Sequence, residues 1–144
     1  MSSYGVEFES PALDITTSGL VAQRTRLNTI SSNLANINST RNEYGQKAPY
    51  QPRFVVFQTD DAIHGPAGSV GVKVSSVEID PRPPLMKYEP GHVDANAEGY
   101  VAYPNIDLTT QFVDALEATR AYEANVGVIE VTKDMTTNTL RILG

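Results

Sequence analysis

Apolar and polar positions alternate at helical spacing near the start of the chain. Leucine occupies every seventh position from Leu13 to Leu34. This spacing predicts a helix over about residues 11–38 that carries one apolar seam. Ser10 is a suitable N-cap, and Asp14 places a negative charge near the positive end of the helix dipole. The first predicted element is therefore a helix whose leucine seam must pack against another apolar surface.

A second helical pattern fills the end of the chain, from Asp107 to about Leu143. Asp107 follows a proline and has the side chain of an N-cap. Apolar residues again favour one side, although Thr119, Lys133 and Thr136 interrupt them. At about 1.5 Å per residue this helix is about 54 Å long, and the first is about 42 Å long. A compact chain of this size has a radius of gyration of about 15 Å, so both helices overhang any core it builds.

The exposed side of the first helix has an unusual composition. More than half of residues 16–40 are Ser, Thr, Asn or Gln, and the only charged residues there are Arg24 and Arg26. A solvated helix face usually carries Glu and Lys. Small uncharged polar groups can form hydrogen bonds across a close helix contact without the cost of burying an ion. The pattern favours a helix that packs against other subunits, and a weak helix that frays is the alternative.

The middle of the chain changes to short alternating runs separated by Pro and Gly. Tyr50–Gln58 and the valines of residues 70–77 predict two strands, and Thr59–Ser69 between them predicts a flexible loop. Leu85–Tyr88 and Tyr100–Tyr103 predict two further short strands around a turn. We expect a small β-rich element inserted between the helices.

These elements predict an α+β fold in which the two terminal helices pair as a coiled-coil domain with a small β-rich insert between them. The expected organisation is an N-terminal leader (1–10), one helical core domain made of residues 11–40 and 105–144, and a small outer β-rich domain (41–104). The length of 144 residues is that of a single domain of ordinary size.

Composition excludes several classes of function. The net charge of −6 comes with no basic patch, which argues against nucleic-acid binding. There is no cysteine, so disulfides and thiolate metal sites are excluded. No apolar stretch is long enough for a membrane span, and we expect no Sec signal at the N-terminus. If the protein works outside the cytoplasm, another export machinery must carry it there.

Candidate chemistry is sparse. His64 lies in the expected loop, and His92 is two residues before Asp94, but no third ligand lies at helical spacing from either. The glycines of residues 65–71 lack the spacing of a phosphate loop, and the acidic residues after Asp94 do not have the order of an EF-hand. Turn-forming Asx residues explain the second pattern better. We therefore predict no catalytic residue, no metal site and no cofactor.

Two stretches carry a specific resemblance. Ser32-Asn33-Leu34-Ala35-Asn36 resembles the S-N-L-A-N sequence shared by axial proteins of the bacterial flagellum, namely rod, hook and hook-associated proteins. Residues 88–107, with Y-E-P-G-H, D-A-N and G-Y-V-A-Y-P-N-I-D in this order, resemble the central block of the proximal-rod proteins of the FlgC family.

The end of the chain extends the resemblance. Residues 120–125 (R-A-Y-E-A-N) and the final I-L-G are similar to the C-terminal helix of the rod and hook class. The resemblance covers roughly residues 11–144, whereas the leader departs from it. It implies a non-enzymatic structural subunit of the proximal rod, which forms a helical hollow shaft across the periplasm, transmits motor torque and houses the export channel.

The resemblance also implies partners, a location and an assembly surface. The implied partners are other copies and other proximal and distal rod proteins, the rod-to-MS-ring adaptor, the flagellar type III export apparatus and the surrounding P ring, without nucleic acid or membrane insertion. Together with the two seams it predicts the following interface residues: Leu13, Leu20, Leu27, Ile30, Asn33, Leu34, Asn36, Phe112, Leu116, Tyr122, Asn125, Val126, Ile129, Leu140 and Leu143.

Two alternatives stay open at this point. The chain could be another flagellar axial protein of the distal-rod or hook type, although these generally have longer middle domains or other central motifs. It could also be a soluble coiled-coil adaptor with a β-insert. A stable, folded free protein with protected helices would favour the adaptor.

Overall fold

The computed structural model describes residues 10–144 of the chain. The expected leader of residues 1–10 lies almost wholly outside the described residues. In order, the elements are α1 (Pro11–Ala35), β1 (Arg53–His64), a short 3-10 turn (Pro66–Gly68), β2 (Val70–Ile79), β3 (Leu85–Tyr88), β4 (Tyr100–Tyr103) and α2 (Leu108–Leu143).

Both helices begin where their caps predict. The Ser10 hydroxyl accepts a hydrogen bond from the Leu13 N–H (3.4 Å), and the Asp107 carboxylate accepts one from the Thr109 N–H (3.1 Å). Helix α1 stops at Ala35, three residues before the predicted end. There the Asn36 side chain donates to the Ser32 carbonyl (2.8 Å), which offers the backbone an alternative to a further helical turn.

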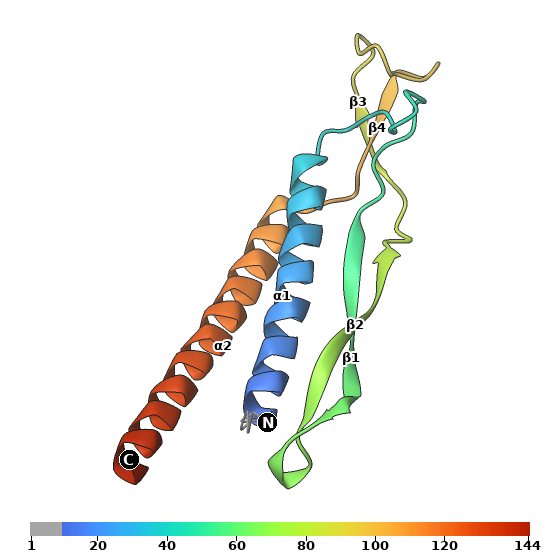
Figure 1. Ribbon diagram of the computed structural model, residues 1–144. Helices are drawn as coiled ribbons and strands as arrows, with labels where there is room; N and C mark the ends of the chain where they lie inside the picture. The colour runs from blue at the N-terminus through green and yellow to red at the C-terminus, as the bar shows by residue number, and fades with distance from the viewer. Residues whose placement is uncertain (1–9) are drawn as a thin grey trace.

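Helix α1 is the central element, with α2 on one side and the β1–β2 ribbon on the other (Figure 1). The helices run antiparallel, since Asn33 near the end of α1 contacts Gln111 near the start of α2. Further along, a Cβ added at Gly19 would lie only 2.9 Å from the Asn125 side chain. Small residues allow this close approach: Ala22 on α1 is 2% exposed, and Ala118 on α2 is fully buried.

Strands β1 and β2 form a long antiparallel ribbon beside α1. The register pairs Arg53 with Ile79 at one end and His64 with Val70 at the other, and it shifts between Val56 and Phe57. Such a shift bends the strand and increases its twist. The ribbon is attached to α1 near its tip, where the Ser18 hydroxyl accepts a hydrogen bond from the β2 backbone.

Strands β3 and β4 pair antiparallel in the second sheet of the described chain, beyond the end of α1 that carries Ala35 (Figure 1). Their bounds match the sequence prediction, Leu85–Tyr88 and Tyr100–Tyr103. Val101 on β4 is fully buried, and Tyr88 stacks edge-on against Tyr100 with ring centroids 5.3 Å apart. After β4 the chain passes through a buried Ile106 and enters α2.

The prediction of a coiled-coil domain with a small insert is wrong. None of the heptad leucines of α1 is fully buried, whereas its buried residues are Thr16, Ala22, Ile30 and Asn33. Small and polar residues make the contact with α2, and the ribbon covers another side of α1 along its length. The observed α+β arrangement is a helix placed between a second helix and a β-ribbon.

The prediction of a flexible loop over Thr59–Ser69 is also wrong for its first half. Strand β1 continues to His64, and pairing of Asp60 with Gly71 holds this part of the chain in the ribbon. Backbone hydrogen bonds to β2 outweigh the loop-forming composition. Only Gly65–Ser69 form the connection, which the Gly65 N–H closes by donating to the Ser69 carbonyl at 2.8 Å.

The subunit has little core of its own. Among the described residues the buried apolar side chains are Ala22, Ile30, Val101, Ile106 and Ala118. The accessible surface is 10110 Å², against about 7,300 Å² for a compact monomer of this mass. Neither helix has a continuous apolar length that would cross a lipid bilayer, as far as the described residues go.

Candidate assembly surface

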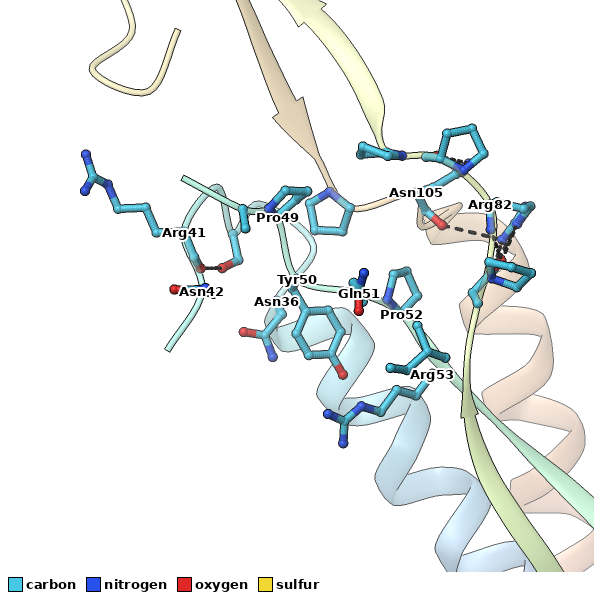
Figure 2. Close-up of a pocket in the computed structure, with 18 of the residues that line it drawn as sticks. Asn36, Arg41, Asn42, Pro49, Tyr50, Gln51, Pro52, Arg53, Arg82 and Asn105 are labelled. Atoms are coloured by element: carbon cyan, nitrogen blue, oxygen red, sulfur yellow. Dashed lines mark hydrogen bonds and ion pairs between the residues drawn. The ribbon is translucent and has the colours of Figure 1, made fainter. Parts of the chain in front are cut away.

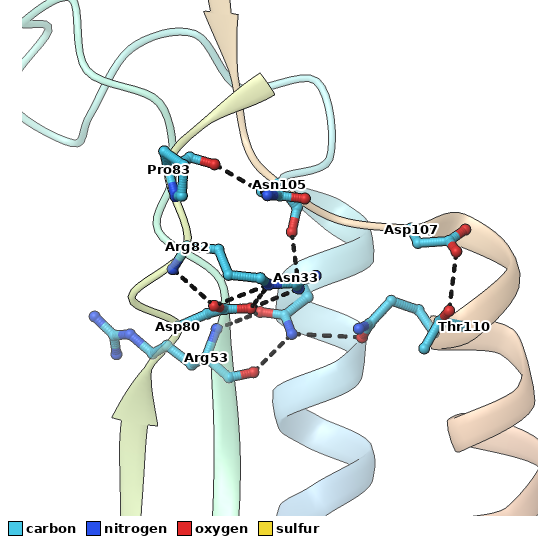
Figure 3. Close-up of polar contacts among 9 residues, drawn as sticks. Asn33, Arg53, Asp80, Arg82, Pro83, Asn105, Asp107 and Thr110 are labelled. Atoms are coloured by element: carbon cyan, nitrogen blue, oxygen red, sulfur yellow. Dashed lines mark hydrogen bonds and ion pairs between the residues drawn. The ribbon is translucent and has the colours of Figure 1, made fainter. Parts of the chain in front are cut away.

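Asn33 is the point where three elements of the subunit meet (Figure 3). Its side chain is 2% exposed and donates to the Arg53 carbonyl (2.8 Å) and to Gln111 (3.4 Å). Its carbonyl oxygen accepts from the Arg53 N–H (3.0 Å) and the Tyr50 hydroxyl (3.3 Å). The central residue of the S-N-L-A-N stretch therefore joins α1 to β1 and α2 inside one subunit.

The remaining predicted interface residues of α1 divide by burial. Ile30 is 6% exposed and belongs to the interior of the subunit. Asn36 is half-buried at the end of the helix. The heptad leucines are all half-buried along one flank of α1: Leu13, Leu20, Leu27 and Leu34. Residues seven apart lie nearly above one another on a helix, so these leucines form a continuous apolar line beside the contact with α2.

The predicted interface residues of α2 are more exposed. Half-buried members lie in the middle of α2: Tyr122, Asn125, Val126 and Ile129. The exposed members are Phe112 (58%), Leu116 (51%), Leu140 (50%) and Leu143 (80%). Residues 133–144 are all exposed, because α2 diverges from α1 towards its C-terminal end (Figure 1). The structure places this second set on the surface of the single subunit.

Sequence reasoning missed a second apolar face of α2, which we call the outer α2 face. Its members are Val128, Val131, Met135 and Ile142, all at least 47% exposed. Spacings of three, four and seven place them on one side of the helix. The same spacings are present in the sequence, beside the interrupted first seam of α2. An exposed apolar stripe of this kind is a candidate interaction surface.

The β1–β2 ribbon also exposes apolar side chains that the predicted interface does not include. Phe54, Phe57, Val77 and Ile79 are 37–49% exposed. A two-stranded ribbon is marginally stable alone and has two unpaired edges. Helix α1 supports one side of this ribbon, and the exposed residues extend the apolar surface beyond the two helices.

A groove of about 960 Å³ opens at the end of the ribbon that adjoins the end of α1 (Figure 2). We call it the proline groove, because its walls include Pro49, Pro52, Pro81, Pro83, Pro84 and Pro104. Arg41, Arg53 and Arg82 also line it. Arg82 binds Asp80 through its side chain (2.6 Å), and this bond is the main reason why the pKa of Asp80 lies below its ordinary value. Rigid proline rings give the groove a fixed shape.

Asp94, in the turn before β4, holds the β3–β4 end of the molecule to the segment that follows α1. Its carboxylate accepts a hydrogen bond from Thr40 (2.7 Å) and pairs with Arg41 (2.6 Å), so the segment after α1 is tied to the β3–β4 turn. These bonds, that from Thr40 first, lower the pKa of Asp94 below its ordinary 3.8. The His92 ring accepts from the Asp94 N–H (3.0 Å), which is a turn contact.

The acidic turn after Asp94 is a structural turn. The Asn96 side chain accepts hydrogen bonds from the backbone N–H groups of Glu98 (3.0 Å) and Tyr100 (2.9 Å), as an Asx turn does. His64 lies at the ribbon tip, whereas His92 lies near β4 at the opposite end of the molecule. Within residues 10–144 no three His, Asp or Glu side chains gather in an arrangement that could hold a metal ion.

Two protein families match this chain, at its two helical ends. Residues 13–42 match the family described as flagella basal body rod protein. Residues 97–142 match the family described as flagellar basal body rod FlgEFG protein C-terminal. The first match covers α1 with the S-N-L-A-N stretch, and the second covers β4 and nearly all of α2.

Similar proteins extend the likeness over about nine tenths of the chain. The flagellar basal-body rod protein FlgC of Salmonella typhimurium is 43% identical over 129 residues, which cover 90% of this chain and 93% of that protein. The proteins of the same name from Bacillus subtilis and Borreliella burgdorferi are 39% and 35% identical, covering 91% and 92% of this chain and 95% of each relative.

Because about nine tenths of the chain is covered, these likenesses include the region between the helices. Identity of 35–43% over about nine tenths of the chain and of its relatives exceeds what a shared helical motif alone produces. The chain belongs to the FlgC family of flagellar basal-body rod proteins.

Proposed function

We propose that this chain is a structural subunit of the flagellar basal-body rod, in its proximal part, and that neighbouring subunits bury the apolar faces of its helices and ribbon. The observation that supports this proposal is the large solvent-accessible area of this member of the rod family. The single subunit exposes about 2,800 Å² more than a compact monomer of its mass. A standard interface buries about 800 Å² on each partner, so this excess corresponds to several neighbours.

The apolar faces on both helices support contacts on more than one side. The heptad leucines line one flank of α1, Phe112 and Leu116 project from the start of α2, and the outer α2 face projects elsewhere. We propose that these residues, with Leu140 and Leu143, contact neighbouring subunits. Ile30 and Asn33 instead stabilise the subunit itself. Faces that differ from one another favour heterologous contacts, which build helical assemblies when they do not close into rings.

We further propose the location and partners that rod assembly entails. The subunit lies in the part of the rod that crosses the periplasm, contacts other proximal and distal rod proteins and the rod-to-MS-ring adaptor, and passes through the flagellar type III export apparatus before assembly. The P ring surrounds the shaft, which is hollow and transmits torque. In this role the chain carries out no catalytic step, and its histidines have no part in motility.

The outer α2 face can be tested by mutation. The native gene is deleted from a motile strain and replaced by a gene for the variant. Replacing Val131 and Met135 by Asp puts charges where a neighbour must cover apolar surface. We expect swimming to be lost and the protein to be absent from isolated basal bodies, at unchanged cellular level. The matched control is Thr137→Asp, an exposed residue of the same helix that lies away from this face.

Normal swimming of the Val131→Asp, Met135→Asp variant, with the protein in the rod, contradicts an assembly role of this face. A test of the wider proposal is the height of the subunit along isolated basal bodies by electron microscopy. A position in the distal rod or hook would support the alternative of another axial protein. A stable, soluble free protein that is absent from basal bodies would support an adaptor.

A further inference from the structure

The chain crosses repeatedly between the helical part of the subunit and the β3–β4 end (Figure 1). Residues 49–52 lead into β1, residues 80–84 lead from β2 to β3, and residues 104–107 lead from β4 to α2. Residues 36–39, which follow α1, cross beside them and contain no proline. We call the first three segments the proline neck, because they hold six of the nine prolines of the chain: Pro49, Pro52, Pro81, Pro83, Pro84 and Pro104.

The composition of the neck restricts its backbone. Each proline ring fixes its own φ, and it also disfavours the helical conformation at the residue before it. In residues 80–84 these limits reach every residue, since Asp80 and Arg82 each precede a proline. None of the three segments contains glycine, the residue that gives a connection most freedom. Proline-rich connections of this kind act as semi-rigid spacers.

Hydrogen bonds tie the neck segments to one another. The Asp80 N–H donates to the Pro52 carbonyl (2.8 Å), which joins the first segment to the second. The Asn105 amide donates to the Pro83 carbonyl (3.0 Å), which joins the second segment to the third. The second segment is therefore held from both sides, and it cannot bend without breaking one of these bonds.

Arg82 adds to the link between the second and third segments (Figure 3). Its guanidinium donates to the Asp80 carboxylate (2.6 Å) and to the Asn105 carbonyl (3.5 Å). An exposed ion pair contributes little stability by itself. Its effect here is to orient the guanidinium, so that Asn105 is held through its side chain and its backbone carbonyl.

The neck is also attached to the helices. The Tyr50 hydroxyl donates to the Asn33 side chain near the end of α1 (3.3 Å). The Tyr50 N–H donates to the Ser39 carbonyl (3.4 Å), which includes the segment after α1 in the same network. Ile106 is 7% exposed, just before the N-cap of α2. The neck is therefore anchored at the end of α1 and at the start of α2.

We propose that the proline neck is a rigid joint, which makes the β3–β4 end and the helical part of the subunit move as one body. A hinge needs a few residues whose φ and ψ can change, and proline removes this freedom at the crossings. The inference goes beyond the proposed function, because it concerns how one subunit transmits force between its two ends. A contact made at the β3–β4 end then loads the helices and the ribbon directly.

The distance between two spin labels tests the joint in the purified full-length chain. The chain has no cysteine, so Gln58→Cys on β1 and Glu98→Cys before β4 place one label on each side of the neck. Double electron–electron resonance of the doubly labelled parent gives one narrow distribution of distances. Replacing Pro83 and Pro84 by Gly restores backbone freedom in the second segment, and the distribution becomes broad.

The matched control replaces two exposed prolines outside the neck, Pro66 and Pro90, by Gly and leaves the distribution narrow. Arg82→Ala is a second neck variant, which keeps every proline and broadens the distribution by a smaller amount. Circular dichroism shows whether each variant keeps its helices. If the variant with two new glycines loses them, the Arg82→Ala variant decides the question.

Three results overturn the proposal. A broad distribution in the folded parent shows that the neck is a hinge. A narrow parent distribution that no folded neck variant broadens shows that these residues do not hold the two parts together. Equal broadening by the control places the flexibility elsewhere. All three results concern one chain in solution, so they leave the rod function standing. Absence of the protein from isolated basal bodies removes that function and leaves the joint.

Discussion

At the scale of single residues, Asn33 makes the hydrogen bonds that join three elements of the subunit. Its amide satisfies both backbone groups of Arg53 and also reaches Gln111 and Tyr50. An amide is suited to this position because it donates and accepts at once. A leucine-like residue at the same place would leave these groups unpaired in a buried position.

Replacing Asn33 by Ala is expected to destabilise the subunit by about 1–3 kcal/mol, because the buried Asn33 amide is lost and the part-buried backbone N–H and carbonyl of Arg53 lose their partner. Urea unfolding followed by circular dichroism measures the change. The matched control is Asn28→Ala, an exposed asparagine of the same helix, which is expected to shift stability by less than about 0.5 kcal/mol. Equal effects of the two substitutions would show that Asn33 does not join the three elements.

Asp94 gives the outer end a dependence on pH. Because the bonds from Thr40 and Arg41 lower its pKa in the folded protein, its contribution to stability is present above its ordinary 3.8 and is lost as the pH falls through the lower folded value. We expect the segment at residues 40–42 to loosen in this acid range. NMR titration of the Asp94 carboxyl measures the pKa, and Arg41→Gln should raise it. A titration of Asp94 at or above 3.8 in the parent protein would contradict the stabilising bonds from Thr40 and Arg41.

At the scale of elements, the ribbon is held on α1 by a close backbone approach. A Cβ added at Gly71 would lie 2.9 Å from the Ile63 Cβ and 3.1 Å from the Ser18 hydroxyl. Gly71→Ala is therefore expected to push the ribbon from the helix and cost about 1–3 kcal/mol. Thermal unfolding provides the measurement, together with loss of the Ser18 contact by NMR.

Gly127 supplies the matched control for Gly71, since no atom lies within 4 Å of a Cβ added there. Gly127 is in the interior of α2, where alanine restricts the unfolded chain and favours the helix. Gly127→Ala is expected to stabilise the subunit by about 0.5–1 kcal/mol. If both substitutions stabilised the protein, the ribbon would not lie as close to α1 as the structure has it.

At the scale of the whole molecule, the exposed C-terminal part of α2 has little to hold it in a free subunit. An isolated helical segment without packing partners is marginal in water. We expect the amides of residues 133–143 to exchange with solvent far faster in the free protein than those of residues 111–125, which lie against α1. In assembled rods the difference should disappear. Hydrogen exchange with mass spectrometry makes the comparison, and equal protection in the free protein would contradict burial by neighbours.

The features that could be predicted from the sequence are those that depend on interactions between residues close together in the chain. The caps at Ser10 and Asp107, the strands Leu85–Tyr88 and Tyr100–Tyr103, and the Asx turn at Asn96 depend on residues within a few positions of one another. Such features are readable because their hydrogen bonds and alternation are short-range. The family resemblance was equally readable, since it rests on residue order alone.

Only the tertiary structure decided which faces these elements bury. The leucine line of α1 was the stronger pattern, yet Gly19, Ala22 and Ala118 make the close helix contact, because small side chains let two backbones approach where leucines cannot. Thr59, Asp60 and His64 pair with β2, a partner that no local rule supplies, so residues 59–64 form the end of strand β1. Burial depends on contacts between residues far apart in sequence, and these exist only once the chain is folded.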